Sequence, residues 1–248
     1  KNSYYINYMV NKNTLQSIIS KYYLNGFNNT VKWRIQDNTL TVYAGKKGRV
    51  CKAVLKHFEF EDCELGIFDT NKLTKLLSIT SGDLMLTPDK INKVYTKLYI
   101  ADANYDLTYS LADIFVIDKV SYVRDVEEYE IQLNLGNDDI DKLIKAKNAL
   151  ADQNNMLITS TKDPDGNPIC EFIFGDNTGF SNKITYKMQG NITQDDIKIP
   201  FDADLLKDIF AANKDMEGGK LKLSTLGLLK LEFTSPLIET EYFLGRNE

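Results

Sequence analysis

The chain has 248 residues, a formal net charge of −5 and a hydrophobic fraction of 43%. This acidic balance excludes a protein that coats nucleic acid indiscriminately, although a locally basic surface can still bind phosphate. No stretch approaches the roughly 20 apolar residues that cross a bilayer, and no signal-peptide pattern lies near the first residue, so we expect a cytoplasmic protein without membrane contact.

The first predicted elements are a strand and a helix. Apolar residues alternate within the first ten positions, and helical spacing follows over residues 12–24. The dipeptide Asn25-Gly26 is typical of a helix C-terminus. The apolar side of this helix is expected in the core, which leaves Lys12 and Lys21 on its exposed side.

Several strands and a second helix follow. Residues 31–42 alternate around an Asp-Asn turn and predict a hairpin, and residues 50–60 resume strand character. Asp69 precedes apolar positions at helical spacing, so we expect it to cap a helix N-terminus by accepting hydrogen bonds from free backbone N–H groups. The outer face of that helix carries Lys72 and Lys75.

A change of pattern near the middle of the chain indicates a boundary. Three short strands are predicted up to residue 110, with a polar loop over residues 88–93. Residues 114–128 contain neither Gly nor Pro and mix apolar with charged side chains, so we expect an extended, partly packed connector. It would join an N-terminal domain, residues 1–113, to a C-terminal domain, residues 129–248.

The second half repeats the order of the first. The strand and helix over residues 5–15 align with residues 130–140 at an offset of 125 positions. The dipeptide that ends in Asp69 recurs, ending in Asp202, at an offset of 133, and each copy precedes an amphipathic helix and an alternating strand. Two matches in the same order indicate a duplication, which predicts an α+β fold of two similarly built domains of about 120 residues.

One lysine does not fit this interpretation. Lys147 falls on the apolar side of the helix predicted over residues 137–151, where a charged side chain has no evident role.

Catalytic and metal-binding patterns are missing from the sequence. The single histidine, His57, lies in a strand-like run without candidate partners. The glycine-containing segments 45–48 and 218–220 lack the spacing of a phosphate-binding P-loop. The segment that begins at Asp163 has proline where a calcium loop needs glycine. The sequence therefore predicts no enzyme activity, no metal and no cofactor, and the three cysteines are expected to be reduced core residues.

The remaining candidate is a set of lysines on the outer faces of the helices. Any one of them is adequately explained as a solvated helix face. If the halves are related by pseudo-symmetry, however, all four helices lie on one side and their lysines form a surface that suits a phosphate backbone without reading sequence. The predicted DNA-facing residues are Lys12, Lys21, Lys72, Lys75, Lys142, Lys145 and Lys207.

Several segments resemble a known family. IFDTN at residues 67–71, LLSI at residues 76–79 and LYIADA at residues 98–103 resemble the first domain of the DNA polymerase sliding clamps of T-even-type tailed phages. DIDKLIK at residues 139–145 and LKL at residues 221–223 are similar to parts of the second domain. The resemblance covers most of the chain.

The resemblance implies a ring of three subunits, each with two pseudo-symmetric clamp domains. Helices would form the inner face, antiparallel sheets the outer face, and edge strands would pair between neighbouring subunits. Lys145 matches a basic position on a DNA-facing helix of the family, whereas Asp138 and Asp208 put negative charge on faces expected to meet DNA.

The implied function is a non-enzymatic processivity factor that tethers a replicative DNA polymerase to duplex DNA by encircling it. Its partners would be double-stranded DNA, the polymerase and an ATP-dependent clamp loader, in the cytoplasm of an infected bacterial host. The competing interpretation is a non-enzymatic viral structural or assembly protein.

Family partners insert short hydrophobic tails between the domains. The candidate groove residues, for which ordinary packing is the alternative, are Val120, Tyr122, Val123, Tyr242, Phe243 and Leu244.

Overall fold

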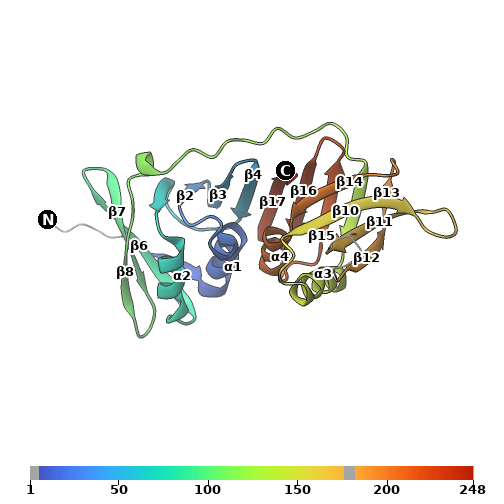
Figure 1. Ribbon diagram of the computed structural model, residues 1–248. Coiled ribbons are helices and arrows are strands. Elements are labelled where there is room, and N and C mark those ends of the chain that lie inside the picture. The colour runs from blue at the N-terminus through green and yellow to red at the C-terminus, as the bar shows by residue number, and fades with distance from the viewer. Residues whose placement is uncertain (1–5, 176–181, 248) are drawn as a thin grey trace. The chain divides into compact units, whose positions relative to one another are not determined.

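The computed structural model describes residues 6–175 and 182–247, which form two compact units (Figure 1). Unit 1 consists of the residues up to Gly45, Cys51–Val120 and Pro236–Glu239. Unit 2 consists of Lys46–Val50, Ser121–Ser235 and the residues from Thr240 onward. The division in the middle of the chain lies between Val120 and Ser121, within the segment predicted to be a connector.

The first half of the chain contains two helices, eight strands and two short 3-10 helices among the described residues. In chain order these are β1 (Tyr8–Asn11), α1 (Lys12–Tyr23), η1 (Leu24–Gly26), β2 (Val31–Gln36), β3 (Thr39–Lys46), β4 (Arg49–Leu55), β5 (Cys63–Ile67), α2 (Thr70–Ser78), β6 (Asp83–Ile91), β7 (Val94–Ala101), β8 (Asp106–Ser110) and η2 (Ile114–Val116).

The second half contains two helices and nine strands among the described residues. They are β9 (Ile131–Leu135), α3 (Asn137–Ala149), β10 (Asn155–Lys162), β11 (Pro168–Phe174), β12 (Ile184–Gln189), β13 (Asn191–Ile192), β14 (Lys198–Asp202), α4 (Ala203–Ala212), β15 (Gly219–Ser224), β16 (Leu228–Thr234) and β17 (Ile238–Gly245).

Strand pairing repeats between the halves. In the first half the strand orders are β1-β6-β7-β8 and β4-β3-β2-β5. In the second half they are β9-β15-β16-β17, with the two-residue β13 added beside β9, and β12-β11-β10-β14. When only pairings within one half are compared and β13 is set aside, each strand of the first half therefore has a counterpart with the same neighbours, and the predicted α+β fold of two similarly built domains is confirmed.

Equivalent aspartates begin the second helix of each half. The Asp69 carboxylate accepts a hydrogen bond from the backbone N–H of Lys72 at 3.0 Å, and the Asp202 carboxylate accepts one from Leu205 at 2.9 Å. Both satisfy a backbone donor that the helix leaves free, which typically contributes about 1 kcal/mol to stability. The two predicted N-caps are confirmed.

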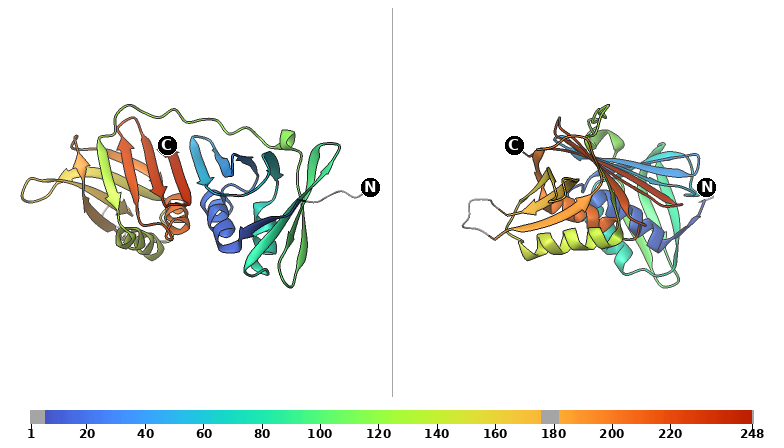
Figure 2. Two further views of the ribbon diagram at one scale, coloured as in Figure 1. Left: turned by 180° about the vertical axis from the view of Figure 1, so that it is seen from behind. Right: turned by 90° about the vertical axis from the view of Figure 1, so that its right-hand side faces the viewer.

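The core of each unit lies between its helices and its strands. In each unit the two helices pack against one another, and strands cover them (Figures 1 and 2). In α1 the residues at helical spacing, Leu15, Ile18 and Ile19, are at most 2% exposed. Burial of such side chains contributes about 1.5 to 3 kcal/mol each, so packing rather than helix propensity holds α1 in place. Trp33 Nε1 donates to the Tyr22 hydroxyl at 3.0 Å within this core.

The prediction of a loop over residues 88–93 is wrong. Pro88 is paired with Leu98 in the ladder between β6 and β7, and the two strands continue to Ile91 and Val94. Asn92 and Lys93 alone form the turn, with positive φ angles of 53° and 69°. Positive φ at both central positions is typical of a two-residue hairpin turn of type I′. The polar composition of the segment concealed strand ends that are exposed at the tip of the hairpin. No helix in the described part of the chain is long and apolar enough to cross a membrane.

Candidate nucleic-acid interface

Helix α2 presents two lysines to solvent. Leu73 and Leu77 are fully buried, and this spacing turns Lys72 and Lys75 outward, where both are exposed. The described residues supply no carboxylate within ion-pair distance of either lysine, and α2 itself contains no acidic residue. Both charges are therefore available to an external anion.

Helix α1 contributes one lysine at its N-terminus. Lys12 is half-exposed, and its Nζ donates to the backbone carbonyl of Thr80. A carbonyl oxygen orients the ammonium group but leaves its charge uncompensated. The sequence of α1 contains no Asp or Glu.

The placement of Lys21 on the exposed side of α1 is wrong. Its side chain is 0% exposed, and its Nζ donates to the Ser17 hydroxyl at 3.0 Å. Lys21 lies three residues after Ile18, so it borders the buried face, and α1 buries a wider face than its apolar residues alone indicated. Lys21 is not available to bind phosphate.

Helices α3 and α4 present a different electrostatic surface. The Nζ of Lys142 lies 2.5 Å from Asp138, four residues earlier on the same helix. Lys214, which follows α4, lies 2.5 Å from Asp141. The pKa of the Asp141 carboxyl is lowered, chiefly by the hydrogen bond from Lys214 and also by the charge of Lys145. The exposed Lys145 therefore shares its surroundings with a carboxylate.

The position of Lys147 is explained by an ion pair between helices. Its Nζ lies 3.0 Å from Asp204 of α4 and donates to the carbonyl of Ala151 at 2.8 Å. Lys207 is half-buried and lies beside Asp208, whose pKa is raised mainly by burial, while the charge of Lys207 opposes that effect.

Comparisons with known proteins now identify the fold. No protein-family model matches the sequence, and no curated protein matches it either. Among solved structures, proliferating cellular nuclear antigen from Entamoeba histolytica superposes with a TM-score of 0.73 at 14% identity, over 98% of this chain and 98% of that chain. The chain has the fold of proliferating cellular nuclear antigen. The PCNA2-PCNA3 complex from Sulfolobus tokodaii gives a TM-score of 0.70 at 12% identity, over 98% and 99% of the two chains.

Two of the six predicted groove residues are core residues of this fold. Tyr242 and Leu244 are 1% and 4% exposed. The Tyr242 hydroxyl accepts a hydrogen bond from the buried Asn213 amide at 2.9 Å. Side chains alternate along β17, so the inward residues of the strand were recognisable from the sequence. Neither residue can line a surface groove.

The other groove candidates reach the surface. Tyr122 is 78% exposed, and Val120 and Val123 are half-exposed. Phe243 is partly exposed on the outward side of β17, where the Lys230 ammonium lies 5.1 Å from the centre of its ring. These four residues remain candidates for contact with a partner.

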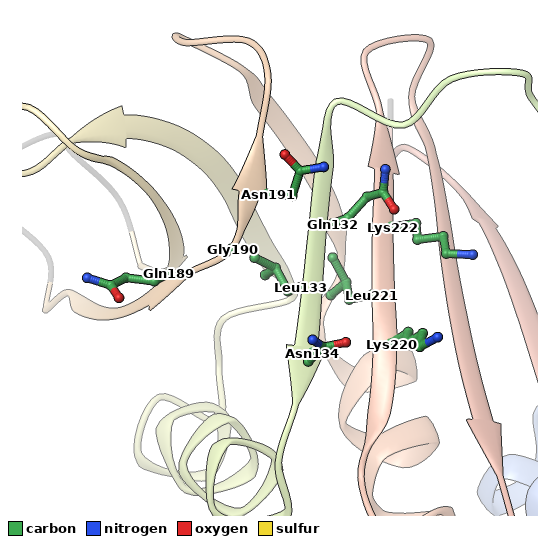
Figure 3. Close-up of a pocket in the computed structure, with 9 residues that line it drawn as sticks. All are labelled: Gln132, Leu133, Asn134, Gln189, Gly190, Asn191, Lys220, Leu221 and Lys222. Atoms are coloured by element: carbon green, nitrogen blue, oxygen red, sulfur yellow. The ribbon is translucent and has the colours of Figure 1, made fainter.

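A polar cavity of about 400 Å³ lies elsewhere in unit 2, and none of the predicted DNA-facing or groove residues lines it (Figure 3). It is formed where β12 ends and β13 joins β9, and β15 supplies Lys220 and Lys222. Lys222 is paired with Glu232 at 2.7 Å. Lysine and leucine alternate along β15, which is typical of a strand with one buried face.

The described residues contain no cluster of three or more His, Cys, Asp or Glu side chains able to hold a metal ion. Burial raises the pKa of the Cys63 and Cys170 thiols to about 12, so both are protonated at neutral pH and are poor nucleophiles.

Proposed function

We propose that this chain is a subunit of a DNA sliding clamp, a ring-shaped processivity factor that tethers a replicative DNA polymerase to duplex DNA. The observation that carries the proposal is the clamp fold, which extends over nearly the whole chain and repeats within it. Lys12, Lys72 and Lys75 support it, because they supply a local attraction for phosphate on an otherwise acidic protein.

In this role, topology replaces affinity. Lysine contacts with phosphate are weak, independent of sequence and easily exchanged, so they permit sliding. A closed ring prevents the protein from leaving the DNA even though each contact is short-lived. Such a function needs no catalytic residue, cofactor or metal.

The ring would be a homotrimer closed by strand pairing between copies. The sheet orders leave β8 at one end of a unit 1 sheet and β12 at one end of a unit 2 sheet. An end strand presents unpaired backbone N–H and C=O groups that a second chain can continue. We propose that β8 of one copy pairs with β12 of the next.

The proposed partners are duplex DNA, a replicative polymerase and an ATP-dependent clamp loader. The sequence resemblance to T-even-type phage clamps favours a phage protein that works in the cytoplasm of an infected bacterium. Hydrophobic tails of partners would contact Val120, Tyr122, Val123 and Phe243. Within each subunit we assign residues 1–113 and 129–248 to the two clamp domains and residues 114–128 to their connector.

The experiment that tests this proposal is retention on circular against linearised DNA after loading. A clamp stays on the closed circle and slides off the ends of the linear molecule, whereas a protein held only by phosphate contacts leaves both at the same rate. Light scattering distinguishes the clamp from a viral structural or assembly protein, since the clamp should have three times the 28.3 kDa mass of the chain.

A further inference from the structure

The two helix pairs occupy equivalent places in the repeat but differ in charge. Helices α1 and α2 carry four lysines and no acidic residue. Helices α3 and α4 carry five aspartates and four lysines. Because the strand order around each pair is the same, the comparison is between equivalent surfaces of a duplicated fold.

In unit 2 the lysines of the helices face aspartates. Lys142 and Lys147 form ion pairs with Asp138 and Asp204, at 2.5 Å and 3.0 Å. The charge of Lys145 helps to lower the pKa of the Asp141 carboxyl, although the hydrogen bond from Lys214 has the larger effect. A phosphate that approaches this surface must displace a carboxylate that remains nearby and repels it.

In unit 1 the corresponding lysines have no such competitors. Lys72 and Lys75 are exposed, and no carboxylate of the described chain lies within ion-pair distance of them. The ammonium group of Lys12 is held by the carbonyl of Thr80. These three cations can exchange a solution counterion for a phosphate, which is the main source of affinity for nucleic acid.

We propose that the face formed by α1 and α2 is the phosphate-binding surface of each subunit and that the face formed by α3 and α4 adds little net attraction. The inference rests on the proposed clamp function and narrows it. The half of each subunit that contains α1 and α2 attracts the phosphate backbone of the duplex. The half that contains α3 and α4 completes the ring around the DNA and adds little attraction for the phosphates.

Two matched double variants of the full chain test this surface. One is Lys72→Gln with Lys75→Gln, and the other is Lys142→Gln with Lys145→Gln. Each removes two exposed lysines three residues apart on a helix. The probe is a short blunt-ended duplex of mixed sequence, and its binding is measured over a range of salt concentrations.

The unit 1 variant should reduce the slope of log affinity against log salt by about 1.8, because each lost phosphate contact reduces it by about 0.9. The unit 2 variant should change this slope by less than about 0.9, which is the contribution of a single phosphate contact. A third variant, Asp138→Asn with Asp141→Asn, removes two competing carboxylates and should bind the duplex more tightly. Circular dichroism establishes that each variant is folded.

Equal losses in the two lysine variants, or an unchanged affinity in the aspartate variant, would overturn the inference. Retention of the wild-type protein on circular and linear DNA is measured in parallel. If the protein leaves both at the same rate, the clamp function fails, while the binding data still decide which face contacts phosphate.

Discussion

Lys147 and Asp204 join the two helices of unit 2, with the lysine Nζ 3.0 Å from the aspartate Oδ1. The lysine side chain is 3% exposed, whereas the aspartate is 52% exposed. The sequence of α3 alone gave the charge of Lys147 no evident role. The ion pair with Asp204 of α4 explains why a lysine lies on the apolar side of this helix.

Removal of the aspartate should therefore cost stability. Asp204→Asn removes the carboxylate and leaves the buried ammonium group of Lys147 with the carbonyl of Ala151 as an acceptor, so we expect a loss of about 1 to 2 kcal/mol in the free energy of unfolding. The exposure of Asp204 keeps the loss below that of a fully buried pair. Denaturant unfolding measures it. In a Lys147→Met background the same Asp204→Asn change should cost much less, and an equal cost in both backgrounds would show that the pair is not coupled.

The two equivalent N-caps should differ in strength. Asp69→Ala removes a cap and should cost about 1 kcal/mol. Asp202→Ala removes a cap and also the ion pair with Arg49, whose guanidinium lies 3.0 Å away in a partly buried position, so its cost should be larger, about 2 kcal/mol. Arg49→Gln provides the control, because it removes the ion pair and leaves the cap. If Asp69→Ala proves the more costly change, the additional role of Asp202 is refuted.

Asp208 should make stability depend on pH in an unusual direction. Burial raises the pKa of its carboxyl above the ordinary value, against an opposing effect of Lys207. A carboxyl whose pKa is higher in the folded state binds protons more readily when folded, so its ionisation destabilises the fold as the pH rises through the folded pKa. Asp208→Asn should therefore stabilise the protein at pH 7, and this gain should disappear below the unfolded pKa of about 3.9. Thermal unfolding at several pH values measures the difference, and a constant gain at every pH would contradict this explanation.

Substitutions of Tyr122 and Tyr242 should have different effects, the first on partner binding and the second on the stability of the fold. Tyr122→Ala removes an aromatic side chain that is 78% exposed, and we expect little change in stability but about tenfold weaker binding of the cognate polymerase. Tyr242→Phe removes a hydroxyl from the buried Asn213 amide and should lower the free energy of unfolding by about 1 to 2 kcal/mol, with polymerase affinity unchanged in the folded protein. Calorimetry and a polymerase binding assay check the pair. Full affinity in the Tyr122 variant would remove this residue from the proposed groove.

Much of the fold could be predicted because it depends on short-range periodicity. The positions of Asp69 and Asp202 before amphipathic segments predicted two helix N-termini, and both are present. The hairpin turn at Asn92 and Lys93 was missed, because its strands are exposed near their tips and lack the alternation that identifies a half-buried strand.

The candidate site was predictable only in part. Lys72 and Lys75 were placed correctly in solvent, because the buried leucines of α2 define a narrow apolar face. Lys21 was misplaced, because burial of a lysine depends on what packs against the flank of its helix. Tyr242 was proposed as a surface residue although the alternation of β17 indicated that it points inward.

The amino-acid sequence by itself determined the internal repeat, the order of its elements and the aspartate N-caps of α2 and α4, because periodicity and capping depend on residues close together in the chain. Only the tertiary structure decided which lysines remain available to an anion. Asp204 is distant from Lys147 in the sequence, and Lys214 is distant from Asp141, so their compensation of charge exists only once α3 and α4 have packed together. Electrostatic attraction acts through space, and a sequence pattern records only distance along the chain.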